Sequence, residues 1–273
     1  MTEAQYNAAI AIYHPTGGKK VGKIYDIRDT DNTAPNDLVV TGGGGTRINK
    51  SGLVESTVLD EPKIDYSFGN VPAFLIEPVR TNFLKYSNDL TNEAWTKQST
   101  TTVTANFATA PDGTNTASKV TADGFSGFYY LRATITGIVS RSVWLKSVDG
   151  TPVTVVLKDP TTTVTELQCS VTSVWKRFVL VESNGASSSG IWIDNINATG
   201  VLVWGAQLEQ TDLSSYIPTT TVAVTRTASA VSIATPSGVT QIEEKVNGVV
   251  NTITTIPTTY SMKEGSTEYV IFR

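Results

Sequence analysis

The chain has few of the residues on which most catalytic sites depend. It contains one cysteine and one histidine in 273 residues. The lone Cys169 excludes an internal disulfide, and we expect it to be a buried or edge-strand thiol. Any Ser-His-Asp or Cys-His arrangement would have to use His14, and one histidine with one cysteine cannot supply a zinc site. We therefore expect that the protein is not an enzyme.

Charge and long apolar runs are also scarce. Charged residues make up 17% of the chain, against roughly 25% in an ordinary soluble domain. The net charge is −4 and no basic stripe occurs, so nucleic acid is not an expected partner. No run of 18 apolar residues exists to span a membrane, and the start of the chain, with Glu3, lacks the basic region of a secretory signal.

Threonine is abundant instead, with 42 copies. Its β-branched, polar side chain suits half-exposed strands. The chain is long enough to bury a core without disulfides or metals, and its length allows one to three domains. A threonine-rich, disulfide-free composition fits a protein that is stable outside a cell better than a metabolic enzyme.

Alternating apolar and polar residues predict an antiparallel β-sandwich over residues 81–210. Short segments of this kind follow one another at spacings of 8 to 14 residues, as in 153–158, 191–194 and 202–209. All five tryptophans lie between Trp95 and Trp204. We expect Trp204 in the core, and this segment to be the main folding unit.

The flanking segments carry weaker signals. Residues 1–13 have helical spacing, with Thr2 as N-cap, and residues 23–27 favour a strand. The run Gly42–Gly45 is interpreted as a flexible linker or a site of tight packing and not as a phosphate-binding loop, because it lacks the G-K-[ST] ending. Residues 216–237 are expected to leave the sandwich and pair with the N-terminal region.

The clearest local signal is a C-terminal hairpin. Asn247-Gly248 lies between two β-branched runs within residues 239–256, which is a strong cue for a two-residue turn. A lone hairpin with a narrow apolar stripe is marginal in water, so we expect three copies to pack around an axis as a homotrimer. The turn predicts the cross-strand pairs Val246 with Val249, Glu244 with Asn251, and Ile242 with Ile253.

The most specific signal lies between Thr46 and Asn82. Its sequence runs T-R-I-N-K-S-G-L-V-E, then P-K-I-D-Y, then V-P-A-F-L-I-E-P-V-R-T-N. This block resembles a recurrent segment of tail-fibre and other virion structural proteins of tailed bacteriophages. The matching positions are Thr46, Arg47, Asn49, Gly52, Leu53, Glu55, Pro62, Asp65, Tyr66, Pro72, Leu75, Glu77, Pro78, Arg80, Thr81 and Asn82.

The resemblance continues through A-P-D-G-T-N-T-A-S-K-V at 110–120, S-V-W-L-K at 142–146 and W-G-A-Q-L-E from Trp204, and covers about residues 12–230. It implies a jelly-roll domain similar to carbohydrate-binding modules in a head-fibre, tail-fibre or decoration protein. It also implies contacts with other virion proteins, and a virion location after synthesis in the host cytoplasm and release on lysis. The expected parts are an N-terminal attachment region (1–79), the jelly-roll domain (80–230), and a C-terminal hairpin and strand (231–273).

Glycans are the expected ligand of the central domain. Sugars stack on aromatic rings while polar side chains bind their hydroxyls. Alternation places Tyr129 and Leu131 toward the core, and Tyr130, Trp144 and Trp192 on polar faces. The candidate glycan-binding residues are Tyr130, Arg132, Trp144, Lys146, Trp192, Asp194 and Gln207.

Two alternatives to an adhesive protein stay open. A pair of carboxylates in a groove would indicate a glycan-cleaving fibre enzyme. A chain without a ligand would be a purely architectural component of the capsid or tail. No cofactor is expected, although jelly-roll sugar modules often hold a structural calcium, whose matching stretches here are residues 82–91 and 207–209.

Overall fold

The protein is all-β, as expected. In the computed structural model the described residues are 9–15, 17–20, 23–25, 38–68, 71–98, 100–124, 126–133, 135, 137–161, 165–184 and 188–273. The strand pairs whose register is defined among them are antiparallel. Within these ranges the structure contains no helix that could cross a membrane.

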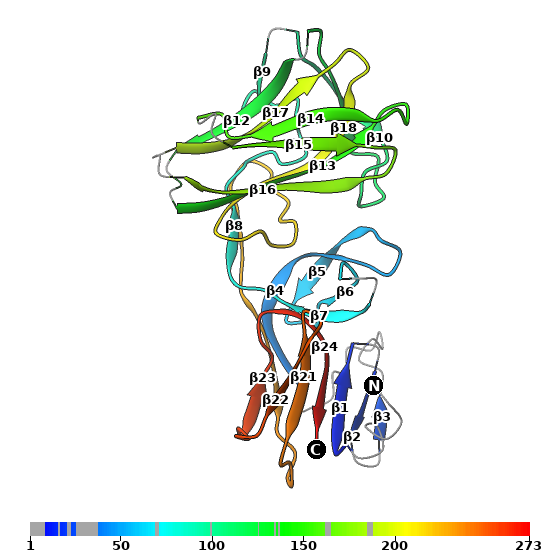
Figure 1. Cartoon of the computed structure of the whole chain (residues 1–273), viewed down its shortest axis with the longest axis vertical. Coiled ribbons are helices and arrows are strands. Elements are labelled where there is room, and N and C mark those ends of the chain that lie inside the picture. The colour runs from blue at the N-terminus through cyan, green and yellow to red at the C-terminus, as the bar shows by residue number, and fades with distance from the viewer. Residues whose placement is uncertain are drawn as a thin grey trace. The chain divides into compact units, whose positions relative to one another are not determined.

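The chain divides into two compact units. Unit 1 combines residues 1–79 with residues 226–273, and unit 2 comprises residues 80–225. The expected N-terminal and C-terminal parts thus belong to one unit, and the central domain is inserted between them (Figure 1). The short strands β8 (Arg80–Asn82) and β19 (Val224–Arg226), at the two ends of this insertion, pair with each other.

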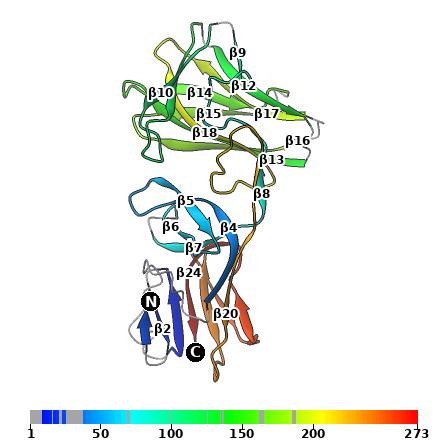
Figure 2. The ribbon, with the colours of Figure 1, turned by 180° about the vertical axis from the view of Figure 1, so that it is seen from behind.

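Unit 2 is a jelly-roll sandwich. One sheet has the order β10-β11-β18-β13-β16 and the other has the order β15-β14-β17-β12-β9 (Figures 1 and 2). Strands β11 to β18 follow the jelly-roll alternation between the two sheets. The strands are β9 (Thr96–Lys97), β10 (Thr102–Ala108), β11 (Ala117–Thr121), β12 (Ser126–Ala133), β13 (Gly137–Ser147), β14 (Val153–Lys158), β15 (Glu166–Val171), β16 (Lys176–Asn184), β17 (Ser188–Ile196) and β18 (Val201–Gln210).

The core of unit 2 lies between these two sheets. Trp95 is almost completely buried there, and its ring packs edge-on against Phe128 and Tyr130, with centroids 5.5 and 5.3 Å away. Cys169 is also buried in this core, as expected for a structural thiol. Alternating aliphatic residues from both sheets fill the remainder, which explains why the period-two pattern identified this domain.

Unit 1 contains an eight-stranded sheet and a four-stranded sheet. The first has the order β22-β21-β24-β1-β2-β3, with β7 also pairing β24 and β6 pairing β7; the second has the order β23-β20-β4-β5. Their shared core includes Tyr13, Phe74, Tyr260 and Phe272. The strands are β1 (Ala11–His14), β2 (Gly17–Lys20), β3 (Lys23–Tyr25), β4 (Leu38–Ile48), β5 (Val54–Leu59), β6 (Ile64–Asp65), β7 (Ala73–Ile76), β20 (Ser229–Ala234), β21 (Ile242–Val246), β22 (Val249–Ile253), β23 (Thr259–Ser261) and β24 (Gly265–Phe272).

The C-terminal hairpin has the predicted register, but its expected isolation is wrong. Val246 pairs with Val249 and Ile242 pairs with Ile253. Strand β21 also pairs along β24, and Ile242 is fully buried in the core of its own chain. The hairpin therefore has its partner within the monomer and gives no physical reason for a trimer.

Two local expectations are also corrected. Residues 11–14 form strand β1, paired with β24, because their side chains complete the unit 1 core; the rest of the expected helix lies mostly outside the described residues. The glycine run belongs to β4 and is not a flexible loop. Gly42 to Gly45 have φ of 70°, 80°, 74° and 79°. A Cβ at Gly42 would lie 2.0 Å from the carbonyl oxygen of Ala228, so glycine is required there.

The expectation that residues 216–237 return to the N-terminal region is confirmed by β20. This strand pairs with β4, with Val231 opposite Val40. It also pairs with β23, so it lies inside the smaller sheet of unit 1.

The large buried aromatic Trp204 should dominate the local stability of unit 2. Its side chain is 2% exposed, so Trp204→Ala should reduce the free energy of unfolding by about 3–5 kcal/mol. Urea denaturation followed by circular dichroism measures this change. Phe107→Ala, at a ring that is 48% exposed, is the control and should cost less than about 1 kcal/mol. A similar small loss for both variants would contradict the packing.

Removing residues 239–273 should unfold unit 1 and leave unit 2 folded. The deletion takes away β24, which lies between β21 and β1 and carries core residues Val270 and Phe272. Limited proteolysis should then leave a resistant fragment close to residues 80–225. Protection of residues 38–76 in the truncated chain would show that β24 is dispensable.

Candidate functional site

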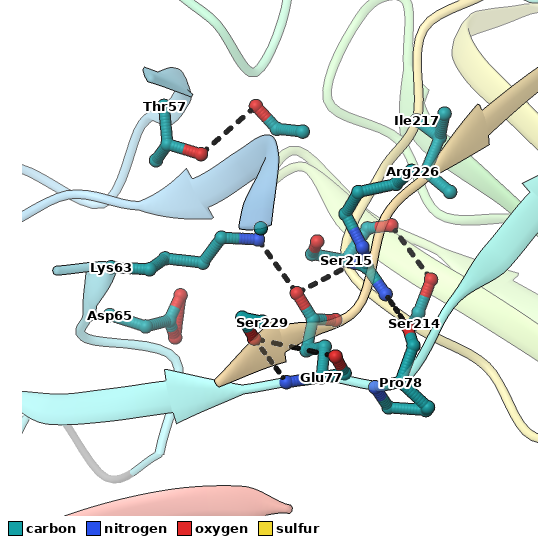
Figure 3. A network of polar contacts seen from close by, with 12 residues as sticks. Thr57, Lys63, Asp65, Glu77, Pro78, Ser214, Ser215, Ile217, Arg226 and Ser229 are labelled. Atoms are coloured by element: carbon teal, nitrogen blue, oxygen red, sulfur yellow. Dashed lines mark hydrogen bonds and ion pairs between the residues drawn. The ribbon is translucent and has the colours of Figure 1, made fainter. Parts of the chain in front are cut away.

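Lys63 and Glu77, in the block between Thr46 and Asn82, form a buried ionic network in unit 1 with Arg226. Glu77 follows β7. Its carboxylate oxygen Oε2 forms ion pairs with Lys63 Nζ at 2.7 Å and with Arg226 Nη1 at 2.6 Å (Figure 3). Arg226 also donates to the carbonyl oxygen of Pro78 at 2.8 Å, and Ser229 Oγ accepts the Glu77 amide at 2.7 Å. The backbone amide and the carboxylate of Glu77 thus join segments that lie about 150 residues apart in the sequence.

This network has the character of a structural element. Burial lowers the pKa of Lys63, and the neighbouring Glu77 carboxylate opposes that shift. Removing one member of a buried ion pair leaves an uncompensated charge, which is strongly destabilising. The network therefore explains the specific residue types at these positions by folding and not by chemistry on a substrate.

Other residues of the block stabilise strand pairs and turns of unit 1. Arg47 pairs with Glu55 across β4 and β5 at 2.9 Å. The side-chain oxygen of Asn49 accepts the amides of Ser51 and Leu53, both at 3.0 Å. Asp65 accepts the amide of Ile48 at 2.8 Å.

Three of the predicted glycan-binding residues of unit 2 are buried. Tyr130 is 6% exposed and packs in the core against Trp95, so its expected outward orientation is wrong. In the run Phe128–Leu131 either parity could have been the apolar one, and Phe128 with Tyr130 fills the core while Tyr129 and Leu131 point outward. Gln207 is fully buried, and its side chain bonds the backbone of Ser215 and Ile217.

Trp144 lies on the outer face of its sheet, as expected, but is covered. Its ring packs 5.3 Å from Trp204 and 5.4 Å from Tyr216, and the Arg177 guanidinium lies 4.4 Å from its centroid. Trp204 belongs to this cluster and not to the core between the sheets. Gly205, with φ of 65°, coincides with a bulge in the pairing of β13 with β18, which reverses the parity of β18.

The structure gives less support to two of the predicted charged glycan-binding residues, Lys146 and Arg132. Lys146 is half-buried in β13, two residues after Trp144. Arg132 pairs with Ser189 in the register of β12 and β17, and its side chain lies outside the described residues.

Trp192 and Asp194 remain as outward-facing residues of β17. Their neighbours Ile191 and Ile193 are fully buried in the core, so alternation places Trp192 and Asp194 on the opposite face. Across the register, Trp192 lies opposite Tyr129 on β12, and the two rings are 5.6 Å apart with a tilt of 48°. We call this outer face of the β15-β14-β17-β12-β9 sheet the platform.

Lys158 on β14 connects the polar side chains of the platform. Its ammonium lies 2.8 Å from Asp194, 3.5 Å from Glu166 on β15, and 4.1 Å from the Trp192 ring centroid. Burial lowers the pKa of Lys158, but the hydrogen bond and charge of Asp194, with Glu166, outweigh it and raise the pKa above its usual value. The lysine is therefore a stable cation that covers one face of the Trp192 ring.

Sequence reasoning missed Tyr129, Lys158 and Glu166. Tyr129 was assigned to the core because two adjacent tyrosines leave the parity of the strand ambiguous. The two charged residues carry no signal of their own, since only the cross-strand register of β14 with β15 and β17 brings them beside Trp192. The signal that could have found Tyr129 is Phe128, the more apolar neighbour.

In the two stretches that could have held calcium, the polar side chains of Asn82 and Glu209 form hydrogen bonds within the protein. The Asn82 side chain bonds the backbone of Leu84, Ala206, Leu208 and Ile217. The Glu209 carboxylate accepts the amide of Ser214 at 2.9 Å. Across the described part of the chain, no group of three or more histidine, cysteine, aspartate or glutamate residues could hold a metal ion.

Comparison with known proteins gives similarity of structure only. No protein-family model and no curated protein matches the sequence. The enzymatically active domain of tailspike protein 4 from bacteriophage CBA120 is similar over 46% of this chain, with 13% identity and a TM-score of 0.35, and this match covers 21% of that protein.

Two carbohydrate-binding modules are similar at the same low level. The xylan-binding CBM22-1 domain of Paenibacillus barcinonensis Xyn10C matches over 49% of this chain and 94% of its own, with 16% identity and a TM-score of 0.36. The CBM6 module of Cellvibrio mixtus lichenase 5A, solved with cellotriose, matches over 48% and 97%, with 15% identity and a TM-score of 0.32.

The buried ionisable groups of unit 2 predict loss of stability at high pH. Burial raises the pKa of Cys169 to about 12 and raises the pKa of Tyr216 above its usual range. In the unfolded chain the thiol ionises near pH 8.5 and the phenol near pH 10. Above these values the unfolded state binds fewer protons than the folded state, so stability is present below them and falls as the pH rises.

The slope should approach about 1.4 kcal/mol per pH unit for each group. Urea unfolding followed by tryptophan fluorescence reports unit 2, because all five tryptophans lie there. Between pH 10 and pH 11 the decline should be shallower in Tyr216→Phe than in the wild type. Equal slopes in the two proteins would contradict the burial of this phenol.

Proposed function

We propose that the protein is a non-enzymatic virion structural protein of a tailed bacteriophage, a head-fibre, tail-fibre or decoration protein that adheres to host or environmental glycans through unit 2. The virion part of the proposal is supported by the residues that match the phage block. Glu77, Arg47, Asn49 and Asp65 each make contacts that shape unit 1. Because the matching residues make these contacts, we infer that unit 1 shares its fold with the phage proteins that it resembles. Such a fold fits an attachment region.

The adhesive part is carried by one observation, the Tyr129–Trp192 ring pair on the outer face of a sandwich sheet. Both rings are half-buried, so they are held rigidly while part of each remains accessible. Leu131, at 53% exposure, extends this apolar surface along β12. Aromatic rings bind the C–H faces of sugars, and the adjacent Asp194 and Glu166 carboxylates can accept hydrogen bonds from sugar hydroxyls.

A purely architectural role is the second candidate. It is favoured by Lys158, whose ammonium already covers one face of the Trp192 ring. In that case the ring and the lysine would only stabilise the sheet. Tyr129 distinguishes the two functions, because its ring is the part of the platform with no cation–π contact among the described residues.

Assembly and location complete the proposal. Homotrimer formation, contacts with other virion proteins and a place in the virion rest on the resemblance of the phage block alone. Mass spectrometry of purified virions tests the location, and light scattering of the full chain tests the oligomeric state.

Substitution of either platform aromatic should weaken adhesion. On a glycan array, Tyr129→Ala and Trp192→Ala should each weaken binding by about fivefold to tenfold, because a well-placed aromatic contact contributes roughly 1 kcal/mol. Phe107→Ala removes an exposed ring from β10 of the other sheet and should leave binding unchanged.

Two outcomes would contradict this function. Binding of unchanged strength in both platform variants would place the ligand elsewhere. Release of reducing ends from a bound polysaccharide by the purified protein would show that the chain is a glycan-cleaving enzyme.

A further inference from the structure

We propose that the platform selects an uncharged glycan chain and discriminates against anionic sugars. This inference rests on the proposed glycan-binding function and adds the chemical class of the ligand. It follows from the charges on the platform and from the direction in which its side chains are aligned.

The described charged side chains of the platform are one cation and two anions. Lys158 is the cation, and Asp194 and Glu166 are the anions. Asp194 is largely shielded, with a side chain 19% exposed, whereas the Glu166 side chain is 40% exposed. An approaching carboxylate or sulfate group would therefore meet net negative charge.

The cation is not available to compensate an anionic sugar. The Lys158 side chain is only 13% exposed, and its ammonium contacts both carboxylates and the Trp192 ring. Binding an external anion would require the lysine to leave Asp194, with the loss of a short, partly buried ion pair. Neutral hydroxyls need no such exchange, because they can donate to the carboxylates as they stand.

The platform side chains form a row that crosses the strands. Thr96 lies opposite Tyr129, Tyr129 opposite Trp192, Trp192 opposite Lys158, and Lys158 opposite Glu166. Five adjacent strands span about 19 Å at the usual strand spacing. A row of this length matches several consecutive sugar rings better than one terminal sugar, so the ligand is a chain lying across the strands.

Matched pairs of probes test the charge preference. The array carries sialylated glycans beside the same glycans without sialic acid, and polygalacturonate beside its methyl ester. At low salt the wild type should bind the neutral member of each pair at least about threefold more strongly, as expected for one like charge near 7 Å in water. The difference should shrink at 1 M salt, where such charges are screened.

A charge variant assigns this preference to the platform. Glu166→Gln should reduce the neutral-to-anionic binding ratio by about threefold. Asp212→Asn is the matched control, because it removes one exposed carboxylate from the segment after β18 and should leave the ratio unchanged.

The outcomes separate this inference from the proposed function. Stronger binding of the anionic members, lost in Tyr129→Ala, would overturn the charge preference and leave glycan adhesion standing. An unchanged ratio in Glu166→Gln would also overturn it. Absence of binding to every probe, or binding that both aromatic variants retain, would overturn the proposed function and this inference with it.

Discussion

Strand parity is the constraint on which the rest of unit 2 depends. Each strand of the sandwich places successive side chains on opposite faces, and the core determines which set is buried. Ile191 and Ile193 enter the core, so Trp192 and Asp194 must face outward. Phe128 and Tyr130 enter from the neighbouring strand, so Tyr129 lies beside Trp192. The platform is therefore a consequence of how the core is filled.

Much of the architecture could be predicted from the sequence because its signals are local. Period two identified the sandwich, and Asn247-Gly248 determined the hairpin register residue by residue. Apart from the return of residues 216–237 to the N-terminal region, long-range pairing was not predictable: nothing near β21 shows that β24 will pair with it, and nothing near Trp192 shows that Lys158 will. The parity errors have two causes. Tyr130 lies in a run of aromatic residues that fit either face, and the Gly205 bulge reverses β18 without a pattern of its own.

The Glu77 network and the platform use charge in different ways. In unit 1, Glu77 is buried with two cations, so the interaction stabilises one arrangement of the chain and offers nothing to a ligand. On the platform, Lys158 is held between carboxylates that remain partly accessible, so the same kind of ion pair can also contact an external partner. The matching residues between Thr46 and Asn82 therefore stabilise the fold. The candidate site consists of residues outside this segment.

The insertion of unit 2 within unit 1 also imposes an order on synthesis. Residues 80–225 leave the ribosome as a complete unit, whereas residues 1–79 must wait for residues 226–273 before their sheets can close. Domains generally fold as units during translation. Strand β1 is made before the inserted unit, and its neighbour β24 is made after it. Strand β1 can pair with β2 as soon as both are made, but its other edge stays open until β24 has been made.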